Sequence, residues 1–272
     1  MSTQQEKAER FLALHHGDSP LLMPNAWDPG TAKLFASLGF AAIATTSSGH
    51  AATLGRLDGA VTRDEALDHA AAMAAATNVP VSCDFENGFA DDPAALAANI
   101  TLAVATGLAG CSVEDFTRRA DDPIYELGLA TERVAAAAEA AHAGPVHMVL
   151  TARAENHLHG RPDLDDTIRR LQAYQEAGAD VLYAPGLYEP GDLRRIVSEV
   201  DRPVNVLANP AVPPIAELRE IGVARVSVGG TLAWVGLSAV IEAAREFLDS
   251  GTYGGFTTAG PGRAAARAAF AS

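Results

Sequence analysis

Several acidic side chains stand at the ends of short runs that favour β-strands. Asp84-x-Glu86 ends one run, Glu114-Asp115 ends the next, and Asp58 lies in the loop after an earlier run. Like charges gathered in one place do not all stay ionised without a counter-ion. Oxygen ligands alone favour a hard cation, and Mg²⁺, or Mn²⁺ in its place, suits carboxylates that act partly through water. This spacing predicts a divalent-cation site, with ordinary solvated loop acids as the alternative.

A further run ends in Arg153-Ala154-Glu155-Asn156. The planar fork of an arginine binds a carboxylate through two parallel hydrogen bonds, so Arg153 is the predicted partner of a substrate carboxylate. A salt bridge from Arg153 to a neighbouring acid is the alternative. Glu155 and His50 are the candidates for a proton donor. The predicted catalytic residues are therefore Arg153, Glu155 and His50.

The segment Thr45-Thr46-Ser47-Ser48-Gly49 follows a strand-like run and offers hydroxyls and exposed backbone N–H groups to an oxyanion. An ordinary polar turn is the alternative interpretation. Asn205 stands in another of the strand-like runs. Together with the arginine, these residues form the predicted substrate-binding set: Thr46, Ser47, Ser48, Arg153 and Asn205.

A zinc site is the competing metal chemistry. His157-x-His159 has the spacing of a zinc pair, although an amidohydrolase barrel carries that pair on its first strand. Structural or surface histidines are the more common case. His147 falls inside a predicted strand, and Cys83 and Cys111 are expected to be small buried hydrophobes.

Eight strand-like runs alternate with stretches of helical period, which indicates repeated βα units. Four predicted helices end in a glycine that precedes the next strand, at Gly39, Gly107, Gly178 and Gly222. Eight such units in about 250 residues predict a (β/α)₈ TIM-type barrel. A doubly wound sheet is less favoured, since no G-x-G-x-x-G or P-loop motif occurs. The predicted strands are Leu21–Met23, Ala41–Thr45, Val81–Asp84, Gly110–Glu114, Val146–Ala152, Val181–Ala184, Val204–Leu207 and Arg225–Val228.

The barrel is expected to occupy residues 1–250 as one domain, opened by an N-terminal helix at Gln5–His15. Residues 251–272 form a predicted Gly-rich linker and a C-terminal helical extension. This extension is either disordered or an arm that packs on a neighbouring subunit.

The composition excludes several classes of protein. The 272 residues carry a net charge of −14 and 48% hydrophobic residues, so a nucleic-acid or membrane partner is not expected. No secretory signal or membrane-spanning run is found, and two cysteines form no disulfide framework. Lys7 and Lys33 are the only lysines, and neither stands where a Schiff base would form. A cytoplasmic protein with a small anionic substrate is predicted.

The chain resembles the isocitrate lyase/phosphoenolpyruvate mutase superfamily over roughly residues 20–245. The resemblance rests on the order of its motifs: TTSSG, Asp58, Asp84-x-Glu86-x-Gly88-Phe89, Val113-Glu114-Asp115 and Ala152-Arg153-x-Glu155. It implies a (β/α)₈ barrel that binds Mg²⁺ and a 2-oxo acid, or a phosphonate analogue, and that breaks or rearranges a C–C or P–C bond through an enolate. It also implies a homo-oligomer, a tetramer or a dimer, in which the eighth helix is exchanged between paired barrels.

By this resemblance, Asp84 would contact the metal directly, and Asp58, Glu86 and Glu114 would hold it through water. Arg153 would grip the substrate carboxylate. Backbone amides around Thr46 and Ser47 would face the 2-oxo oxygen.

One loop departs from the pattern of the best-known members. Isocitrate and methylisocitrate lyases carry a Cys-containing loop shortly after the Glu-Asp pair, whereas residues 116–123 read FTRRADDP. Phosphoenolpyruvate mutases place Lys and Asn there, and neither is present, although Arg118 or Arg119 could hold charge over the site. The chain is therefore predicted to be a lyase or phosphonomutase-like enzyme without Cys dependence. The alternative is a catalytically inactive barrel that binds 2-oxo acids.

Overall fold

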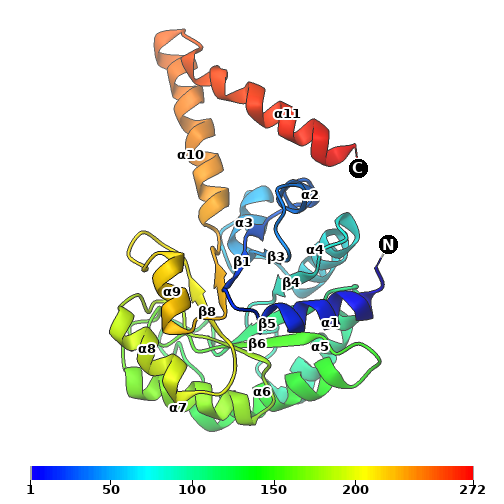
Figure 1. Cartoon of the computed structure of the whole chain (residues 1–272), viewed down its shortest axis with the longest axis vertical. Coiled ribbons are helices and arrows are strands. Elements are labelled where there is room, and N and C mark those ends of the chain that lie inside the picture. The colour runs from blue at the N-terminus through cyan, green and yellow to red at the C-terminus, as the bar shows by residue number, and fades with distance from the viewer. Residues whose placement is uncertain (1, 272) are drawn as a thin grey trace.

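The computed structural model describes residues 2–271 and confirms the (β/α)₈ barrel (Figure 1). Each strand pairs in parallel with its neighbours around the barrel. The strands are β1 (Leu21–Met23), β2 (Asn25–Ala26), β3 (Ile43–Thr45), β4 (Val81–Asp84), β5 (Gly110–Glu114), β6 (Val149–Arg153), β7 (Val181–Tyr183), β8 (Val204–Leu207) and β9 (Arg225–Ser227).

The first barrel strand is split in two, and the split closes the barrel. β1 pairs with β9 and β2 pairs with β3, while Pro24 between them has no N–H to continue a ladder. The Asn25 side chain spans the seam, because its amide donates to the Thr45 carbonyl (2.6 Å) and its oxygen accepts from the Val228 and Gly229 amides (both 3.0 Å). One buried side chain therefore joins the residues that follow β9 to β3.

The helices between the strands cover the outside of the barrel, and several of them begin at a side chain that caps the helix. Asp28 caps α2 and Thr62 caps α4, each accepting from the third backbone N–H of its helix. The helices are α1 (Gln4–Leu14), α2 (Pro29–Ser37), α3 (Ser47–Thr53), α4 (Arg63–Ala76), α5 (Pro93–Ala105), α6 (Leu127–His142), α7 (Leu164–Glu176), α8 (Pro190–Glu199), α9 (Ile215–Ile221), α10 (Thr231–Arg245) and α11 (Ala259–Phe270).

The four glycines predicted to join helices to strands adopt the left-handed conformation, with φ of 95° at Gly39, 92° at Gly107, 104° at Gly178 and 94° at Gly222. A residue with a Cβ would be strained there. These joints set the spacing between successive βα units.

Two local interpretations were wrong. The segment Thr45–Gly49 is not the ordinary polar turn of the alternative interpretation, because Thr46 caps a helix, α3, that begins at Ser47. β6 begins at Val149 rather than Val146, so His147 precedes the strand and is exposed. The Met148 backbone N–H donates to the Ala141 carbonyl in α6 (3.1 Å) rather than to a neighbouring strand, so the ladder begins at Val149.

The barrel interior is closed at the amino ends of the strands by α1. The Phe11 ring is fully buried there, among small and aliphatic residues of the strands. Gly110 on β5 leaves room for it, since a Cβ at that position would lie 2.6 Å from the ring. The other end of the barrel is free for polar side chains.

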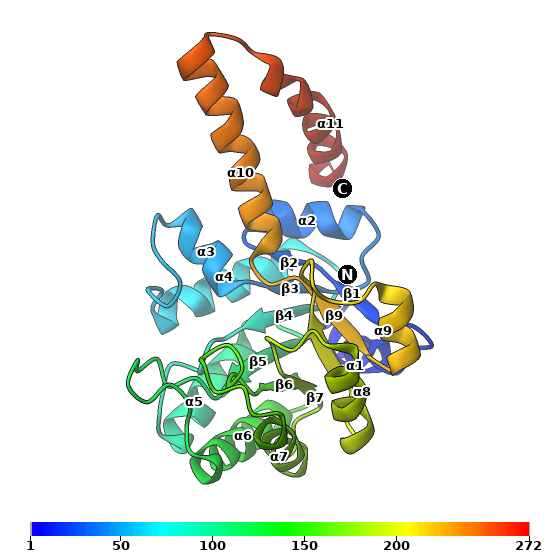
Figure 2. The ribbon, with the colours of Figure 1, turned by 90° about the vertical axis from the view of Figure 1, so that its left-hand side faces the viewer.

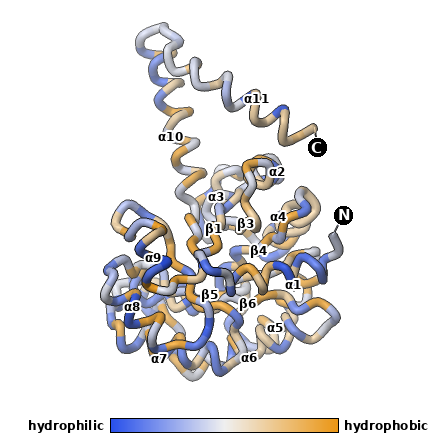
Figure 3. Tube along the Cα trace, in the orientation of Figure 1, coloured by the Kyte–Doolittle hydropathy of each residue, from blue (hydrophilic) through white to orange (hydrophobic). Residues whose placement is uncertain are grey.

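The C-terminal segment forms an arm that projects from the barrel (Figures 1 and 2). α10 leads outward, a π-helical turn (Glu246–Ser250) and a 3₁₀ turn (Gly254–Thr258) reverse the chain, and α11 returns toward α2. Helix α11 begins four residues before the predicted Arg263, and Ser272 lies outside the described residues. Hydrophobic residues recur along the arm (Figure 3), and several large ones are exposed: Trp234, Val235, Val240, Ile241, Phe247 and Leu248.

Within residues 2–271, no helix combines the length and the apolar character needed to cross a bilayer.

Candidate active site

The carboxyl ends of the strands open into a cavity of about 460 Å³. Barrel enzymes carry their chemistry at this end, because the loops after all strands meet there. The lining includes five carboxylates and three guanidiniums, from Asp58, Asp84, Glu86, Glu114, Glu155, Arg118, Arg153 and Arg225.

Arg153 ends β6 and is the centre of this cavity. Its Nη1 lies 2.9 Å from an Asp84 oxygen, its Nη2 lies 3.1 Å from Glu114, and its Nε lies 2.7 Å from Glu155. The guanidinium also lies 5.3 Å from the centre of the Tyr183 ring, within the range of a cation–π contact. Each nitrogen has its own acid, so the plane of the guanidinium is firmly oriented.

Asp84 connects Arg153 to the segment after β3. Its second oxygen accepts from the Ser47 backbone N–H (3.0 Å) and from the Ser47 hydroxyl (2.8 Å). The Ser47 amide predicted to face a substrate oxygen therefore faces the Asp84 carboxylate. This contact is possible because Ser47 is the first residue of α3, so its backbone N–H has no carbonyl partner within the helix.

A second ion pair lies above the first, between Glu86 and Arg118. Their closest atoms are 3.0 Å apart, and Arg118 also donates to the Gly59 carbonyl. Both residues have positive φ, 50° at Glu86 and 64° at Arg118, a conformation uncommon for residues with a Cβ. Strained backbone of this kind clusters at functional sites.

The acidic side chains of this cavity outnumber the basic ones. Burial raises the pKa of Glu86 to about 7, and it raises the pKa of Glu114 and of Glu155, although Arg118 and Arg153 act in the opposite direction. The lining has five carboxylates and three guanidiniums, and Arg225 is bonded to Asn205 and Thr151 rather than to an acid. An all-oxygen donor set with this excess fits a hard divalent cation.

Aromatic rings form part of the wall beside these charges. Phe116, in the loop after β5, stacks on His159 with centroids 3.8 Å apart. Tyr183 contributes from the end of β7, and burial raises the pKa of its hydroxyl to about 12, so it remains a neutral phenol. Cys83 also lines the cavity, and burial raises the pKa of its thiol to about 12. No thiolate is therefore formed here near neutral pH.

The structure brings most of the sequence-predicted site residues together and sets two apart. The cavity is lined by Asp58, Asp84, Glu86, Glu114, Arg153, Glu155, Thr46, Ser47 and Ser48. His50 lies behind it, stacked on His69 at 3.7 Å beside a much smaller pocket. Asn205 is buried below the cavity, where it accepts from Arg225 (2.8 Å) and donates to Ser227 (2.9 Å).

Arg225 is a functional candidate that the sequence reasoning missed. It lies in β9, is fully buried, and reaches the cavity floor with Asn205 and Thr151 as partners. Burial lowers its pKa to about 10. A charged residue inside the apolar run Val223–Val228 was the available signal.

The zinc pair considered from the sequence is not assembled. His159 stacks on Phe116, while the buried Nε2 of His157 has no hydrogen-bond partner. In the described chain, the group of three His, Cys, Asp or Glu side chains with ligand atoms within 4.8 Å of one another is His142, His147 and Asp180. The four predicted acids form no such group: Asp84 and Glu114 pair with Arg153, Glu86 pairs with Arg118, and Asp58 accepts from the Gly59 backbone N–H.

Comparison with known proteins agrees with this geometry. The family model described as phosphoenolpyruvate phosphomutase matches residues 11–248. A crystal structure from Burkholderia cenocepacia J2315, provisionally described as a lyase/mutase, has a TM-score of 0.94 and 48% identity, covering 97% of this chain and 95% of that one.

Two curated relatives are similar along most of their length. An uncharacterized protein of Mycobacterium tuberculosis H37Rv is 34% identical, over 88% of this chain and 89% of its own. Oxaloacetate decarboxylase 2 of Pseudomonas fluorescens Pf0-1 is 28% identical, over 90% and 84%. With its barrel, its rim of acids and these matches, the chain belongs to the phosphoenolpyruvate phosphomutase family, within the isocitrate lyase/phosphoenolpyruvate mutase superfamily.

Proposed function

We propose that this protein is a Mg²⁺-dependent enzyme that breaks a C–C bond in a small 2-oxo carboxylate and passes through an enolate. The observation that carries the proposal is the acid-rich cavity around Arg153, whose lining has five carboxylates against three guanidiniums. Mg²⁺, or Mn²⁺ in its place, would be held by Asp84 directly and by Asp58, Glu86 and Glu114 through water. The bound cation would supply positive charge to the 2-oxo oxygen as it becomes an enolate.

Arg153 is suited to hold the substrate carboxylate. Its fork already engages three acids, so a substrate carboxylate would replace one of them and keep the same planar geometry. Tyr183 holds the guanidinium from its face. The reacting carbon would thereby be fixed relative to the acids on β4 and β5, which is the main contribution of a positioned anion-binding residue.

Glu155 is the best-placed proton donor. It is 2% exposed in its side chain, and burial raises its pKa, which favours the protonated form. Its Oε1 accepts from Arg153 and its backbone N–H donates to Asp115 (2.8 Å), so its position is well defined. A protonated Glu155 can deliver that proton to the enolate carbon.

The surroundings favour C–C cleavage without a cysteine. The loop after β5 has no Cys or Lys, and Cys83 in the cavity is a neutral buried thiol. Loss of CO₂ from a 2-oxo dicarboxylate needs only stabilisation of the resulting enolate, and no thiol. The 28% identity with an oxaloacetate decarboxylase supports oxaloacetate as the first substrate to test.

The test is a panel of oxaloacetate, 2-methylisocitrate and phosphonopyruvate, each with Mg²⁺ and with EDTA. We expect Mg²⁺-dependent turnover of oxaloacetate that is lost in Asp84→Ala and Arg153→Ala. Arg63→Ala and Asp64→Ala are the matched controls, since these two residues form an exposed ion pair on α4. Full activity in Asp84→Ala and Arg153→Ala would show that this cavity is not the active site.

An inactive 2-oxo-acid-binding barrel is the second candidate. It is favoured by one observation: Arg153 and Arg118 are both already paired with acids of the chain. Binding of oxalate with Mg²⁺ by calorimetry, without turnover of any of the three compounds, would select this alternative.

We also propose a cytoplasmic homo-oligomer, a dimer or tetramer, that acts on a small molecule and not on nucleic acid or membrane. The support is the acidic composition and the exposed hydrophobic residues of the arm, which a second copy would cover. Light scattering of the purified chain measures the mass directly.

A further inference from the structure

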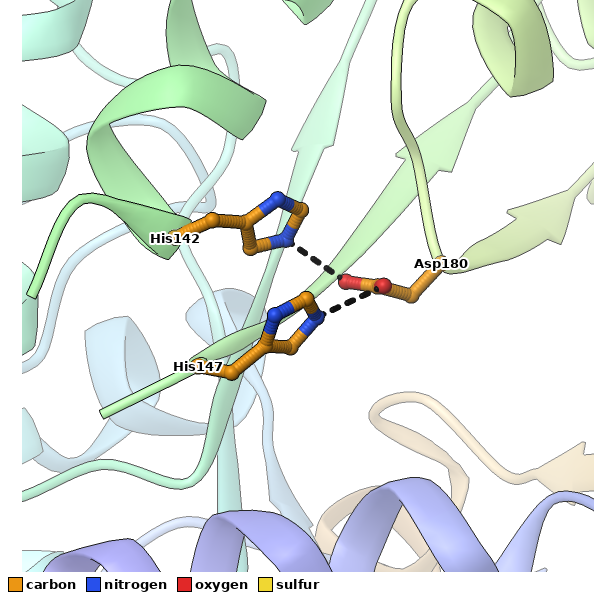
Figure 4. Close-up of side chains that lie close together, drawn as sticks. All are labelled: His142, His147 and Asp180. Atoms are coloured by element: carbon orange, nitrogen blue, oxygen red, sulfur yellow. Dashed lines mark hydrogen bonds and ion pairs between the residues drawn. The ribbon is translucent and has the colours of Figure 1, made fainter. Parts of the chain in front are cut away.

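Three metal-ligand side chains converge at the end of the barrel opposite to the cavity. His142 ends α6, His147 lies two residues before β6, and Asp180 immediately precedes β7. Figure 4 shows the two imidazoles and the carboxylate pointing toward one another from these three segments. Because Arg153 lies six residues after His147 along β6, the two sites are separated by roughly 20 Å.

The donor atoms are already close to one another. Nε2 of His142 lies 3.0 Å from one Asp180 oxygen, and Nε2 of His147 lies 2.9 Å from the other. The two rings are stacked, with centroids 3.8 Å apart and planes inclined by 9°. A tetrahedral zinc ion with bonds of about 2.0–2.1 Å spaces its ligand atoms by about 3.3 Å, so small side-chain rotations would accommodate it.

Access and anchoring also suit a metal ion. Asp180 is buried, and its Oδ2 accepts from the Leu150 backbone N–H at 2.8 Å, which holds the carboxylate in place. The His147 side chain is 45% exposed and that of His142 is 24% exposed, so an ion can reach both rings from solvent. A backbone hydrogen bond to a ligand carboxylate is a usual second-shell support of metal sites.

We propose that His142, His147 and Asp180 form a second metal site, selective for a borderline divalent ion such as Zn²⁺ rather than for Mg²⁺. Two imidazole nitrogens and one carboxylate suit Zn²⁺, whereas Mg²⁺ prefers oxygen ligands only. A water molecule completes the coordination. The ion links the end of α6 and the entry to β6 with the entry to β7, and it stabilises this end of the barrel.

This site is tested with Zn²⁺ alone, in the full-length protein stripped with a chelator and supplied with excess Mg²⁺ to compete for carboxylate sites. Calorimetry is expected to show one Zn²⁺ per chain. His142→Gln and His147→Gln each keep a side-chain N–H for Asp180 but offer no ligand nitrogen. Loss of a second-shell partner already costs 10- to 100-fold in affinity, so each variant is expected to bind at least about 100-fold more weakly.

The control is His16→Gln, which removes an exposed histidine outside the site and should bind as wild type does. Zn²⁺ at 100 times its Kd is expected to raise the Tm of wild type by roughly 5–10 °C and to leave His147→Gln unchanged. Absence of Zn²⁺ uptake, or equal uptake by wild type and both Gln variants, would overturn the site. A purely hydrogen-bonding role of the histidines would change the metal-free Tm but not its response to Zn²⁺.

Discussion

At the carboxyl ends of the strands, five carboxylates share a cavity with three guanidiniums, whereas at the amino ends the single carboxylate of Asp180 accepts from two imidazoles and a backbone amide. Burial raises the pKa of Glu86, Glu114 and Glu155 at the first end. At the second end, hydrogen bonds hold the pKa of Asp180 below its ordinary value, although burial acts against them.

The two ends of the barrel differ in how their buried charge is compensated. Excess buried charge costs free energy and is tolerated where a cation or a substrate can compensate it. A fully hydrogen-bonded carboxylate contributes to stability instead. The two ends should therefore respond in opposite directions to pH, and only the cavity end should respond to substrate.

The largest expected effect is the loss of activity when the Arg153 guanidinium at the centre of the cavity is removed. Arg153→Met should lower kcat/KM for the active 2-oxo acid by 10³-fold or more, about 4 kcal/mol, because substrate binding is lost and three acids lose their partner. Arg153→Lys, which keeps charge but not the fork, should fall between wild type and Arg153→Met. Arg63→Met is the control, and circular dichroism checks folding. Activity within tenfold of wild type in Arg153→Met would contradict the proposed role.

The next largest effect is a loss of stability in acid, and it concerns His15 at the amino end of the barrel. His15, whose Nε2 lies 3.3 Å from Arg225, has a pKa lowered to about 3, mainly by burial. The unfolded chain therefore takes up this proton first as pH falls below about 6.5. The stabilisation linked to neutral His15 is fully present above about pH 6.5 and is lost as the pH falls toward 3. Between pH 7 and 4, wild type should lose about 3 kcal/mol more unfolding free energy than His15→Gln.

Urea unfolding at the two pH values measures this difference, and His16→Gln should behave as wild type does. Identical losses in wild type and His15→Gln would show that His15 is protonated in the folded barrel.

A smaller effect of opposite sign is expected at the cavity. The pKa of Glu86 is raised to about 7 by burial, so its protonated form stabilises the fold at low pH. This contribution is present below about pH 4.5 and is lost as pH rises through about 7. From pH 5 to 8 in EDTA, wild type should lose about 2 kcal/mol more stability than Glu86→Gln.

Thermal melts in EDTA and in Mg²⁺ measure the effect, and the loss should shrink in Mg²⁺. Glu139→Gln, an exposed position on α6, serves as the control. A Glu86→Gln variant that loses as much stability as wild type would show that Arg118 keeps Glu86 ionised throughout.

The smallest effect on the barrel is expected from the arm. Val240 is 64% exposed on α10, so Val240→Glu should reduce the oligomer mass while changing the stability of the barrel by less than about 0.5 kcal/mol. Light scattering and urea unfolding measure the two quantities. Ala94→Glu, on the exposed side of α5, is the control. An unchanged mass in Val240→Glu would show that this face of the arm is not an interface.

Much of the fold follows from local chemistry. The glycines that end the helices and the β-branched runs that follow them are readable without a structure, because both reflect preferences of a few adjacent residues. The expectation that Asp84, Glu114 and Arg153 meet also follows, since the carboxyl ends of parallel strands lie at one end of a barrel.

Only the structure shows which of two neighbouring residues faces the cavity and which lies behind the strand. Glu114 faces the cavity, while Asp115 turns away and accepts from Tyr174 (2.6 Å) and Arg170 (3.1 Å) behind the strand. Asn205 likewise supports Arg225 rather than a substrate. In such cases strand register and packing decide the partner, and a residue pattern alone does not contain them.

Periodicity and the polarity of the strand ends were therefore enough to predict the barrel, the acid-rich rim and the central arginine. The contacts of Arg153 with Asp84 and Glu114, and the convergence of His142 and His147 on Asp180, are visible only in the folded molecule. These contacts join residues more than 30 positions apart, which are brought together by the packing of neighbouring strands and helices.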